Sequence, residues 1–239
     1  MEDILVYPAG YGKAAFYAED FLNQYGIPVT DHPTPDATHL LLDVPTKEIP
    51  TELLERLPEN ITVIGGNLDR PELTCYKTID LLRREAYLAR NAAITAECAL
   101  QIAANESDSV VSDTSVLVIG WGRIGKCLAS LLKNIGCNVT VAARKESDRA
   151  ILEALGYNSI DPQRLNSLRK YTLIYNTVPQ PILSPEQLTF SPGCIKIDLA
   201  SRQGLNGKDV IWARGLPGQY APKSSGKLIA DILVKEVLS

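Results

Sequence analysis

The chain has 239 residues, of which 45% are hydrophobic and 22% are charged. This balance is typical of a globular protein with a sizeable core, and it excludes an intrinsically disordered chain. The apolar runs are far too short to span a membrane, and the acidic start Met1-Glu2-Asp3 does not fit a signal peptide. We therefore expect a cytoplasmic protein with no membrane partner.

Charge and cysteine usage narrow the class of ligand. The net charge of −4 divides into −9 for residues 1–76 and +5 for residues 77–239. A basic C-terminal part favours anionic ligands, although drift in surface composition would give the same numbers. The basic residues are scattered and are not interleaved with aromatic ones, which argues against nucleic acid. The five cysteines form no Cys-x-x-Cys pair, so we expect neither a disulfide framework nor a metal site.

Residues 1–75 predict a small N-terminal α/β lobe. Strand and helix patterns alternate along this segment, and such alternation is typical of a small parallel sheet. The expected elements are strand 4–7, helix 14–24, strand 39–42, helix 50–57 and strand 61–64.

Residues 76–105 contain no glycine or proline and carry apolar residues at roughly helical spacing, which predicts one long connecting helix. Asn91 and Thr95 are four residues apart and so fall on one face of it. A helix that joins two α/β lobes commonly lines the cleft between them. Two interpretations stay open: the pair faces such a cleft, or Thr95 only bonds back to the carbonyl of Asn91.

Residues 106–239 show a regular strand–helix alternation that predicts a doubly wound parallel sheet, the Rossmann fold. The last helix either belongs to this domain or packs back on the N-terminal lobe. The expected elements are strands 115–119, 138–143, 172–175, 194–197 and 210–212, and helices 124–134, 148–155 and 222–238.

A glycine-rich turn, Gly120-Trp121-Gly122-Arg123-Ile124-Gly125, follows the first of these strands and opens the next helix. In this context the first glycine allows a tight turn, the second lets a pyrophosphate approach the backbone, and the third lets helix and strand pack closely. Amides at the helix N-terminus then bind the phosphates. The turn predicts a dinucleotide site, and a purely structural glycine turn is the alternative.

The end of the second Rossmann strand, Ala142-Ala143-Arg144-Lys145-Glu146-Ser147, bears on which dinucleotide binds. A site for NAD usually places a carboxylate at this tip, where it accepts a hydrogen bond from the ribose 2′-hydroxyl. Here Arg144, Lys145 and Ser147 offer two cations and a hydroxyl, which suit a 2′-phosphate. We expect NADP. The alternative is a solvated surface pair, with Glu146 serving NAD instead.

Four later loops should converge on one crevice, because open α/β sheets bind ligands at the carboxyl ends of their strands. Considered singly, each loop is ordinary turn chemistry. The last of them opens a helix with hydroxyls, amides and a lysine, which suit a carboxylate. The loops are Asn176-Thr177-Val178-Pro179, Asp198-Leu199-Ala200-Ser201-Arg202, Arg214-Gly215-Leu216-Pro217-Gly218 and Ala221-Pro222-Lys223-Ser224-Ser225-Gly226.

The chain from residue 91 onward resembles the family of the A subunit of bacterial dipicolinate synthase. The matching pieces, in order, are NAAITAECAL, GWGRIG, VTVAARK, NTVP, IDLAS, GLPG and APKSSG. The wider relatives of that family are the two-domain NAD(P)-dependent 2-hydroxyacid dehydrogenases. The resemblance implies oxidation of dihydrodipicolinate to dipicolinate with NADP, a flavoprotein partner (the B subunit of that enzyme), and a role in sporulation.

The chain departs from the family pattern in two places. The family's N-terminal domain is longer and opens with a glycine-rich loop, whereas this lobe is shortened and has Tyr7-Pro8-Ala9-Gly10-Tyr11-Gly12 after its first strand. The family also has proline where this chain has Arg214. A shorter lobe would reshape the substrate pocket, so a different small acid is an alternative substrate.

On this interpretation the catalytic candidates are Lys223 and Asp198, and the identity of the proton acceptor stays open. Whether the chain forms a homo-oligomer also stays open, and a non-catalytic regulatory subunit is the rival function. A same-fold reductase of another keto or imino acid is a second rival. Nucleotide contacts are expected at 120–125, 144, 145, 147, 176–179 and Leu199. Carboxylate contacts are expected at Asn91, Thr95, Ser201, Gly218, Lys223, Ser224 and Ser225.

Overall fold

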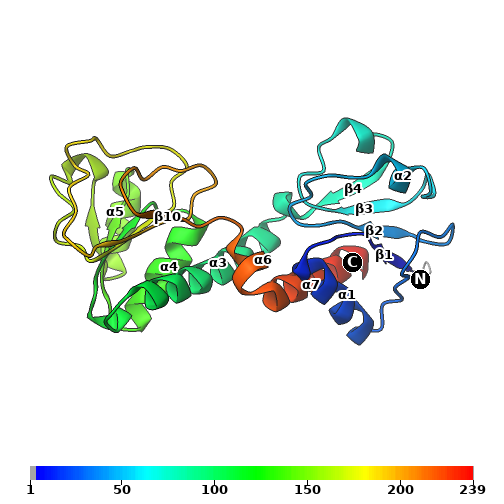
Figure 1. Ribbon diagram of the computed structural model, residues 1–239, viewed down its shortest axis with the longest axis horizontal. Coiled ribbons are helices and arrows are strands. Elements are labelled where there is room, and N and C mark those ends of the chain that lie inside the picture. Colours follow the sequence, from blue (N-terminus) through cyan, green and yellow to red (C-terminus); the bar gives the residue numbers. More distant parts are fainter. Residues whose placement is uncertain (1–3, 239) are drawn as a thin grey trace. The chain divides into compact units, whose positions relative to one another are not determined.

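A computed structural model describes residues 4–238 and divides the chain into two compact units (Figure 1). The first unit comprises the residues up to Ile94 together with those from Pro217 onward. The second comprises Thr95–Leu216. The acidic start Met1–Asp3 lies outside the described residues. Within residues 4–238, no helix combines the length and the apolarity needed to cross a membrane.

The first unit is built on a four-stranded sheet in which each neighbouring pair of strands is parallel. Its order is β1 (Val6–Pro8), β2 (His39–Leu41), β3 (Thr62–Gly65) and β4 (Lys77–Asp80). All four residues of β3 are buried, as expected for a central strand covered on both faces. The connections contain α1 (Lys13–Gln24), α2 (Thr51–Leu54) and the 3₁₀ turn η1 (Pro71–Leu73).

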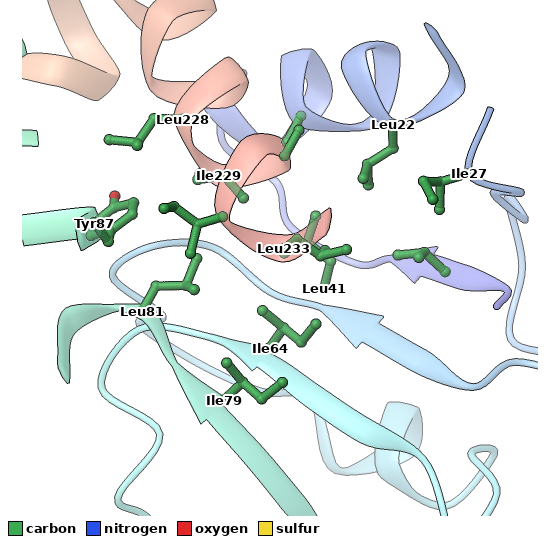
Figure 2. Packing of buried hydrophobic residues seen from close by; sticks show 14 residues of the cluster. Leu22, Ile27, Leu41, Ile64, Ile79, Leu81, Tyr87, Leu228, Ile229 and Leu233 are labelled. Atoms are coloured by element: carbon green, nitrogen blue, oxygen red, sulfur yellow. The ribbon is translucent and has the colours of Figure 1, made fainter. Parts of the chain in front are cut away.

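The end of the chain completes the core of this first unit. Helix α7 (Pro222–Leu238) packs against α1, and its Leu228, Ile229 and Leu233 lie in the same core cluster as Leu41 and Ile64 of the sheet (Figure 2). The two helices approach closely at Gly226, where an added Cβ would lie 2.5 Å from the Cβ of Tyr17. Burial of such side chains contributes roughly 1.5–3 kcal/mol each. The last helix is therefore part of the N-terminal core.

The expected helix over residues 76–105 is corrected at its start. Residues Lys77–Asp80 form β4, the 3₁₀ turn η2 (Leu81–Arg83) follows, and α3 (Glu85–Glu106) begins only at Glu85. Ile79 is buried in the sheet core, and the Asp80 carboxylate accepts a hydrogen bond from the Leu82 amide at 2.9 Å, which ends the strand. The lack of glycine and proline in residues 76–84 therefore did not indicate a helix, because a short edge strand can form without either residue.

The second unit contains a six-stranded sheet in the order β10–β9–β8–β5–β6–β7, and every pair in it is parallel. Numbered along the chain, this is the order 6-5-4-1-2-3 of a Rossmann fold, with its switch point between β5 and β8. The fold class expected from the sequence is confirmed. The strands are β5 (Ser115–Ile119), β6 (Asn138–Ala142), β7 (Asn158–Ile160), β8 (Leu173–Asn176), β9 (Ile195–Asp198) and β10 (Val210–Trp212).

Two amphipathic helices connect the first three strands of this sheet. They are α4 (Arg123–Asn134), which buries Leu128 and Leu132, and α5 (Glu146–Ala154), which buries Leu152. Strand β7 is short and polar, and the sequence pattern did not predict it. The remaining elements are η3 (Val111–Asp113), η4 (Pro162–Arg164) and α6 (Leu216–Tyr220).

Candidate functional site

A pocket lies in the second unit where the loops after β5, β6, β7 and β8 meet. This is the switch point of the sheet, the place where doubly wound folds bind their ligands. The pocket brings together six of the residues expected to bind a nucleotide with five that were not expected. Its lining residues are Gly120, Trp121, Gly122, Ala142, Ala143, Arg144, Lys145, Asp148, Pro162, Val178 and Ile182.

The three glycines of the turn after β5 have different structural roles. Gly120 has a φ of +104°, and an added Cβ there would lie 2.4 Å from Thr177 Oγ1. A Cβ on Gly125 would lie 2.3 Å from the carbonyl oxygen of Gly120, so this glycine lets α4 pack against the turn. A Cβ on Gly122 would meet nothing within 4 Å. Gly122 is thus the glycine that leaves room beside the backbone.

The start of α4 is suited to an anion. Gly122 is the N-cap residue and provides no side chain to cap the helix. The first turn of a helix leaves backbone N–H groups without intrahelical partners, and the helix dipole favours negative charge there. Gly122 also lines the pocket, so a phosphate can approach this helix end directly. The geometry fits the pyrophosphate of a dinucleotide.

Charged side chains lie where the β6 loop meets the pocket. Arg144 and Lys145 follow β6 and are exposed, and Asp148 lines the same pocket from the first turn of α5. Asp148 was not predicted, because a ribose-binding carboxylate is expected at the tip of the strand and not in the following helix. The sequence feature that could have pointed to Asp148 is an acidic residue in the first turn of a helix, a common stabilising position. Ser147, which was expected to contact the nucleotide, is not among the lining residues.

The opposite walls of the pocket are apolar. Pro162 comes from the η4 turn after β7, and Val178 and Ile182 come from the loop after β8. Such surfaces suit the faces of a planar ring, because a nucleotide base buries apolar area against them. Pro162 and Ile182 belong to no motif, and only the folded sheet brings them to the glycine turn.

Asp198, expected to be catalytic, has a fully buried carboxylate. Its Oδ1 accepts hydrogen bonds from Asn176 Nδ2 at 3.0 Å and from the Ala200 amide at 2.9 Å. Its Oδ2 accepts from the amides of Gly204 at 2.8 Å and Leu205 at 2.7 Å. With both oxygens engaged and shielded from solvent, Asp198 holds the loop after β9. Its expected role in catalysis stays a prediction.

Asn176 completes this buried network. Its Nδ2 also donates to the carbonyl of Val178 at 2.9 Å, and its Oδ1 accepts from the Val178 amide at 3.1 Å. The Thr177 hydroxyl donates to the carbonyl of Ile119 at 2.9 Å, and the amide of the buried Leu199 donates to the carbonyl of Asn176 at 2.8 Å. These expected nucleotide contacts therefore shape the loops, and only Val178 lines the pocket. Arg123, Ile124 and Pro179 are not among the lining residues either.

The expected carboxylate-binding residues are distributed over both units. Thr95 and Ser201 belong to the second unit. Lys223 and Ser224 are exposed in the first turn of α7, whereas Ser225 is buried and its amide donates to the carbonyl of Ala221 at 2.9 Å. These assignments stay predictions. The members that belong to the first unit are Asn91, Gly218, Lys223, Ser224 and Ser225.

No protein-family model matches the chain. The A subunit of dipicolinate synthase from Bacillus subtilis (strain 168) is 30% identical over 169 residues, which cover 66% of this chain and 57% of that protein. The match thus spans less than two thirds of the curated relative. The crystal structure of the A subunit of dipicolinate synthase from Bacillus halodurans superposes with a TM-score of 0.78 at 21% identity, covering 100% of this chain and 99% of that one.

Solved dehydrogenases share this fold at low sequence identity. A D-isomer specific 2-hydroxyacid dehydrogenase from Lactobacillus delbrueckii ssp. bulgaricus, solved in an NAD complexed form, has a TM-score of 0.51 at 12% identity. That match covers 98% of this chain and 96% of the other. The glycine turn, the strand order and these likenesses agree: the chain has a dehydrogenase-type Rossmann fold and is similar in sequence and structure to the A subunit of dipicolinate synthase.

Proposed function

We propose that the chain is an NADP-dependent dehydrogenase that oxidises dihydrodipicolinate, a cyclic dicarboxylate, to dipicolinate. The observation that carries this proposal is the pocket at the switch point, where an open glycine at a helix N-terminus lies close to two cations. The similarity to the A subunit of dipicolinate synthase supports the substrate. The relative's name also supports a second component, for which we propose the flavoprotein B subunit of sporulating bacteria.

In this proposal each wall of the pocket binds one part of the cofactor. The amides at the start of α4 beside Gly122 bind the pyrophosphate, and the surfaces of Pro162, Val178 and Ile182 contact the adenine. When bound, NADP supplies the hydride acceptor. The chain itself binds, orients and shields the reacting groups, which is the usual contribution of a protein to cofactor chemistry.

The choice of NADP over NAD depends on Arg144 and Lys145. A guanidinium can meet a phosphate with two parallel N–H donors, and Lys145 adds a second positive charge. Asp148 favours the alternative, NAD, because a carboxylate in this pocket can accept a hydrogen bond from a ribose hydroxyl. Two exposed cations outnumber this one carboxylate, so we favour the 2′-phosphate.

For the substrate, the chemistry needs anion binding and orientation more than a strong base. Loss of a hydride and a proton from the dihydropyridine ring yields an aromatic pyridine, and aromatisation supplies much of the driving force. We propose that Lys223, with Ser224 at the start of α7, binds a substrate carboxylate. Asn91, Gly218 and Ser225 of the same unit are proposed to complete this second site, and Thr95 and Ser201 of the other unit are proposed to bind a carboxylate as well.

The test uses the purified full-length chain. NADP should bind more tightly than NAD, and NADP should be reduced when a dihydropyridine dicarboxylate is added, as followed by absorbance. Nucleotide binding without turnover, even with the flavoprotein added, would favour a regulatory role. Turnover with a keto or imino acid alone would favour a different reductase. A chain that binds no dinucleotide would refute the proposal.

The dicarboxylate site has its own variant. Lys223→Ala should weaken dicarboxylate binding by about tenfold, the effect of losing one charge-assisted contact, and should leave nucleotide affinity unchanged. Calorimetric titration measures both. Lys235→Ala, which removes the same charge from an exposed residue near the other end of α7, is the matched control. Equal losses of nucleotide and dicarboxylate affinity would show that Lys223 has a different role.

A further inference from the structure

The side chain of Arg149 packs behind the loop that carries the two pocket cations. Its Nη1 donates to the carbonyl of Ala143 at 2.8 Å and to the carbonyl of Arg144 at 2.6 Å. The same nitrogen lies 3.4 Å from Asp161 Oδ2 in an ion pair. Both side chains are mostly buried, with exposed fractions of 20% and 23%. The guanidinium is thus engaged with the protein's own backbone.

Asp161 connects this arginine to a second wall of the pocket. Its Oδ1 accepts a hydrogen bond from the amide of Gln163 at 3.0 Å and so caps the η4 turn. That turn begins with Pro162, which lines the pocket. One carboxylate therefore contacts the loop after β7 through one oxygen and Arg149 through the other.

Within residues 4–238, the loop after β6 has no strand partner to hold its backbone. Strands β6 and β7 pair up to Ala142 and Ile160, and the last ladder bond runs from the amide of Ala143 to the carbonyl of Ile160 at 3.0 Å. Beyond it, Arg144 and Lys145 cross to α5 outside the ladder and are exposed. An unanchored exposed loop costs conformational entropy when it orders on a ligand, and anchoring it beforehand reduces that cost.

We propose that Arg149 and Asp161 are positioning residues that hold Arg144 and Lys145 ready for the 2′-phosphate, and thereby set the preference for NADP over NAD without touching either nucleotide. This inference rests on the proposed function. It gives Arg144 and Arg149, five residues apart, opposite roles: the first binds the ligand and the second binds the loop. Arginine suits the second role because it keeps its charge when mostly buried, and its long side chain brings Nη1 to two carbonyls and a carboxylate together.

The measurement is the ratio of the dissociation constants for NAD and NADP. The two nucleotides differ only in the 2′-phosphate, so general damage to the pocket weakens both equally and leaves the ratio unchanged. A displaced loop changes the ratio, because only NADP depends on the placement of the two cations. Full-length variants are titrated with both nucleotides at one ionic strength, since exposed contacts are screened by salt.

Arg149→Met should lower the preference for NADP by roughly 3- to 30-fold, about the effect of misplacing one charge-assisted contact. The affinity for NAD should stay within about twofold. Arg149→Lys should restore only part of the preference, because the shorter lysine side chain keeps the charge but reaches the three oxygens less well. Asp161→Asn should act in the same direction, and the double variant should lose less than the sum of the single losses, as coupled residues do.

Arg164→Met is the matched control, since it removes the same charge from an exposed residue of the neighbouring η4 turn. It should leave the ratio unchanged. A ratio that stays the same in folded Arg149→Met, or that falls equally in the control, would overturn the inference. If Arg149→Met does not fold, the ratios of Arg149→Lys and Asp161→Asn decide in the same way. Failure of the unmodified chain to bind either nucleotide would refute the proposed function itself.

Discussion

At the scale of single residues, we expect two glycines of the turn after β5 to have different roles: Gly125 is needed for folding and Gly122 for nucleotide binding. Gly125→Ala should destabilise the chain by about 1–3 kcal/mol, because its Cβ would overlap the carbonyl of Gly120, and backbone cannot move aside cheaply. Gly122→Ala should change the free energy of unfolding by less than about 0.5 kcal/mol, since its φ of −81° suits alanine and its Cβ meets nothing.

The same Gly122→Ala variant should weaken dinucleotide binding by at least about tenfold, because the added methyl group occupies the space that the pyrophosphate needs. Denaturant unfolding and calorimetric titration of both variants give the two free energies. A Gly122→Ala variant that binds both nucleotides as tightly as the unmodified chain would show that the phosphates lie elsewhere.

Arg144 is the residue that separates the two nucleotides. Arg144→Ala should weaken NADP binding by roughly 10- to 150-fold, the loss of about 1.5–3 kcal/mol for a hydrogen bond to a charged group, and should leave NAD binding nearly unchanged. Arg144→Asp should reverse the preference. Lys145 can soften the loss, so a double alanine variant is the stricter form. Affinities that fall together would show that Arg144 does not select between the nucleotides.

Much of this site could be predicted from the sequence because its chemistry is local. The glycine turn and Arg144 each follow a strand within a few residues, and the strand fixes where they lie. Pro162 and Ile182 could not be predicted, because they reach the pocket only through the pairing of β6 with β7 and of β5 with β8. The buried hydrogen bonds of Asp198 could not be predicted either, because they need Asn176 from the paired strand β8 and a folded-back loop that brings three amides to the carboxylate.

At the scale of elements, one carboxylate of α7 contacts both α1 and α3. Asp231 accepts hydrogen bonds from Tyr25 and Arg90, both at 2.6 Å, and from Lys227 at 2.8 Å. Burial alone would raise the pKa of Asp231, but these hydrogen bonds outweigh burial and lower the pKa to about 2. The carboxylate is mostly buried, with an exposed fraction of 18%.

The lowered pKa sets a direction for acid unfolding. The pKa of Asp231 is about 2 in the folded chain and ordinarily 3.8, so its ionised form stabilises the fold above about pH 4 and this stabilisation is lost as the pH falls towards 2. The loss should amount to about 2 kcal/mol. Asp231→Asn should remove this pH dependence, and Asp36→Asn, an exposed control, should keep it. Urea unfolding at several pH values measures it, and equal slopes for both variants would contradict the assignment.

The elements also differ in how well the sequence pattern predicted them. The strands β5 and β6 and the helix α4 agree with expectation, because their periodicity and their glycine boundaries point to one structure. The prediction for residues 77–80 was wrong, because a four-residue strand with one buried side chain shows too little periodicity to be distinguished from the adjoining helix. Tertiary pairing with β3 decides that segment.

At the scale of the whole molecule, the sequence predicted two α/β parts and left open where the last helix belongs. The apolar face of α7 is suited to any sheet that needs a cover, so periodicity alone could not choose. Packing decides the position of α7: Gly226 allows close contact with α1, and Leu228, Ile229 and Leu233 enter the core of the first unit. The first unit is consequently made from both ends of the chain.

This arrangement has a consequence for synthesis. A ribosome makes Val6 and Leu22 long before the side chains of α7 that cover them, because the whole second unit lies between them along the chain. At about 5–20 residues per second, the nascent first unit waits on the order of ten seconds with its apolar surface exposed. The second unit, Thr95–Leu216, is continuous and is synthesised entirely before α7. We therefore expect the second unit to fold before the first, although the first begins earlier in the chain, because only the first unit needs α7.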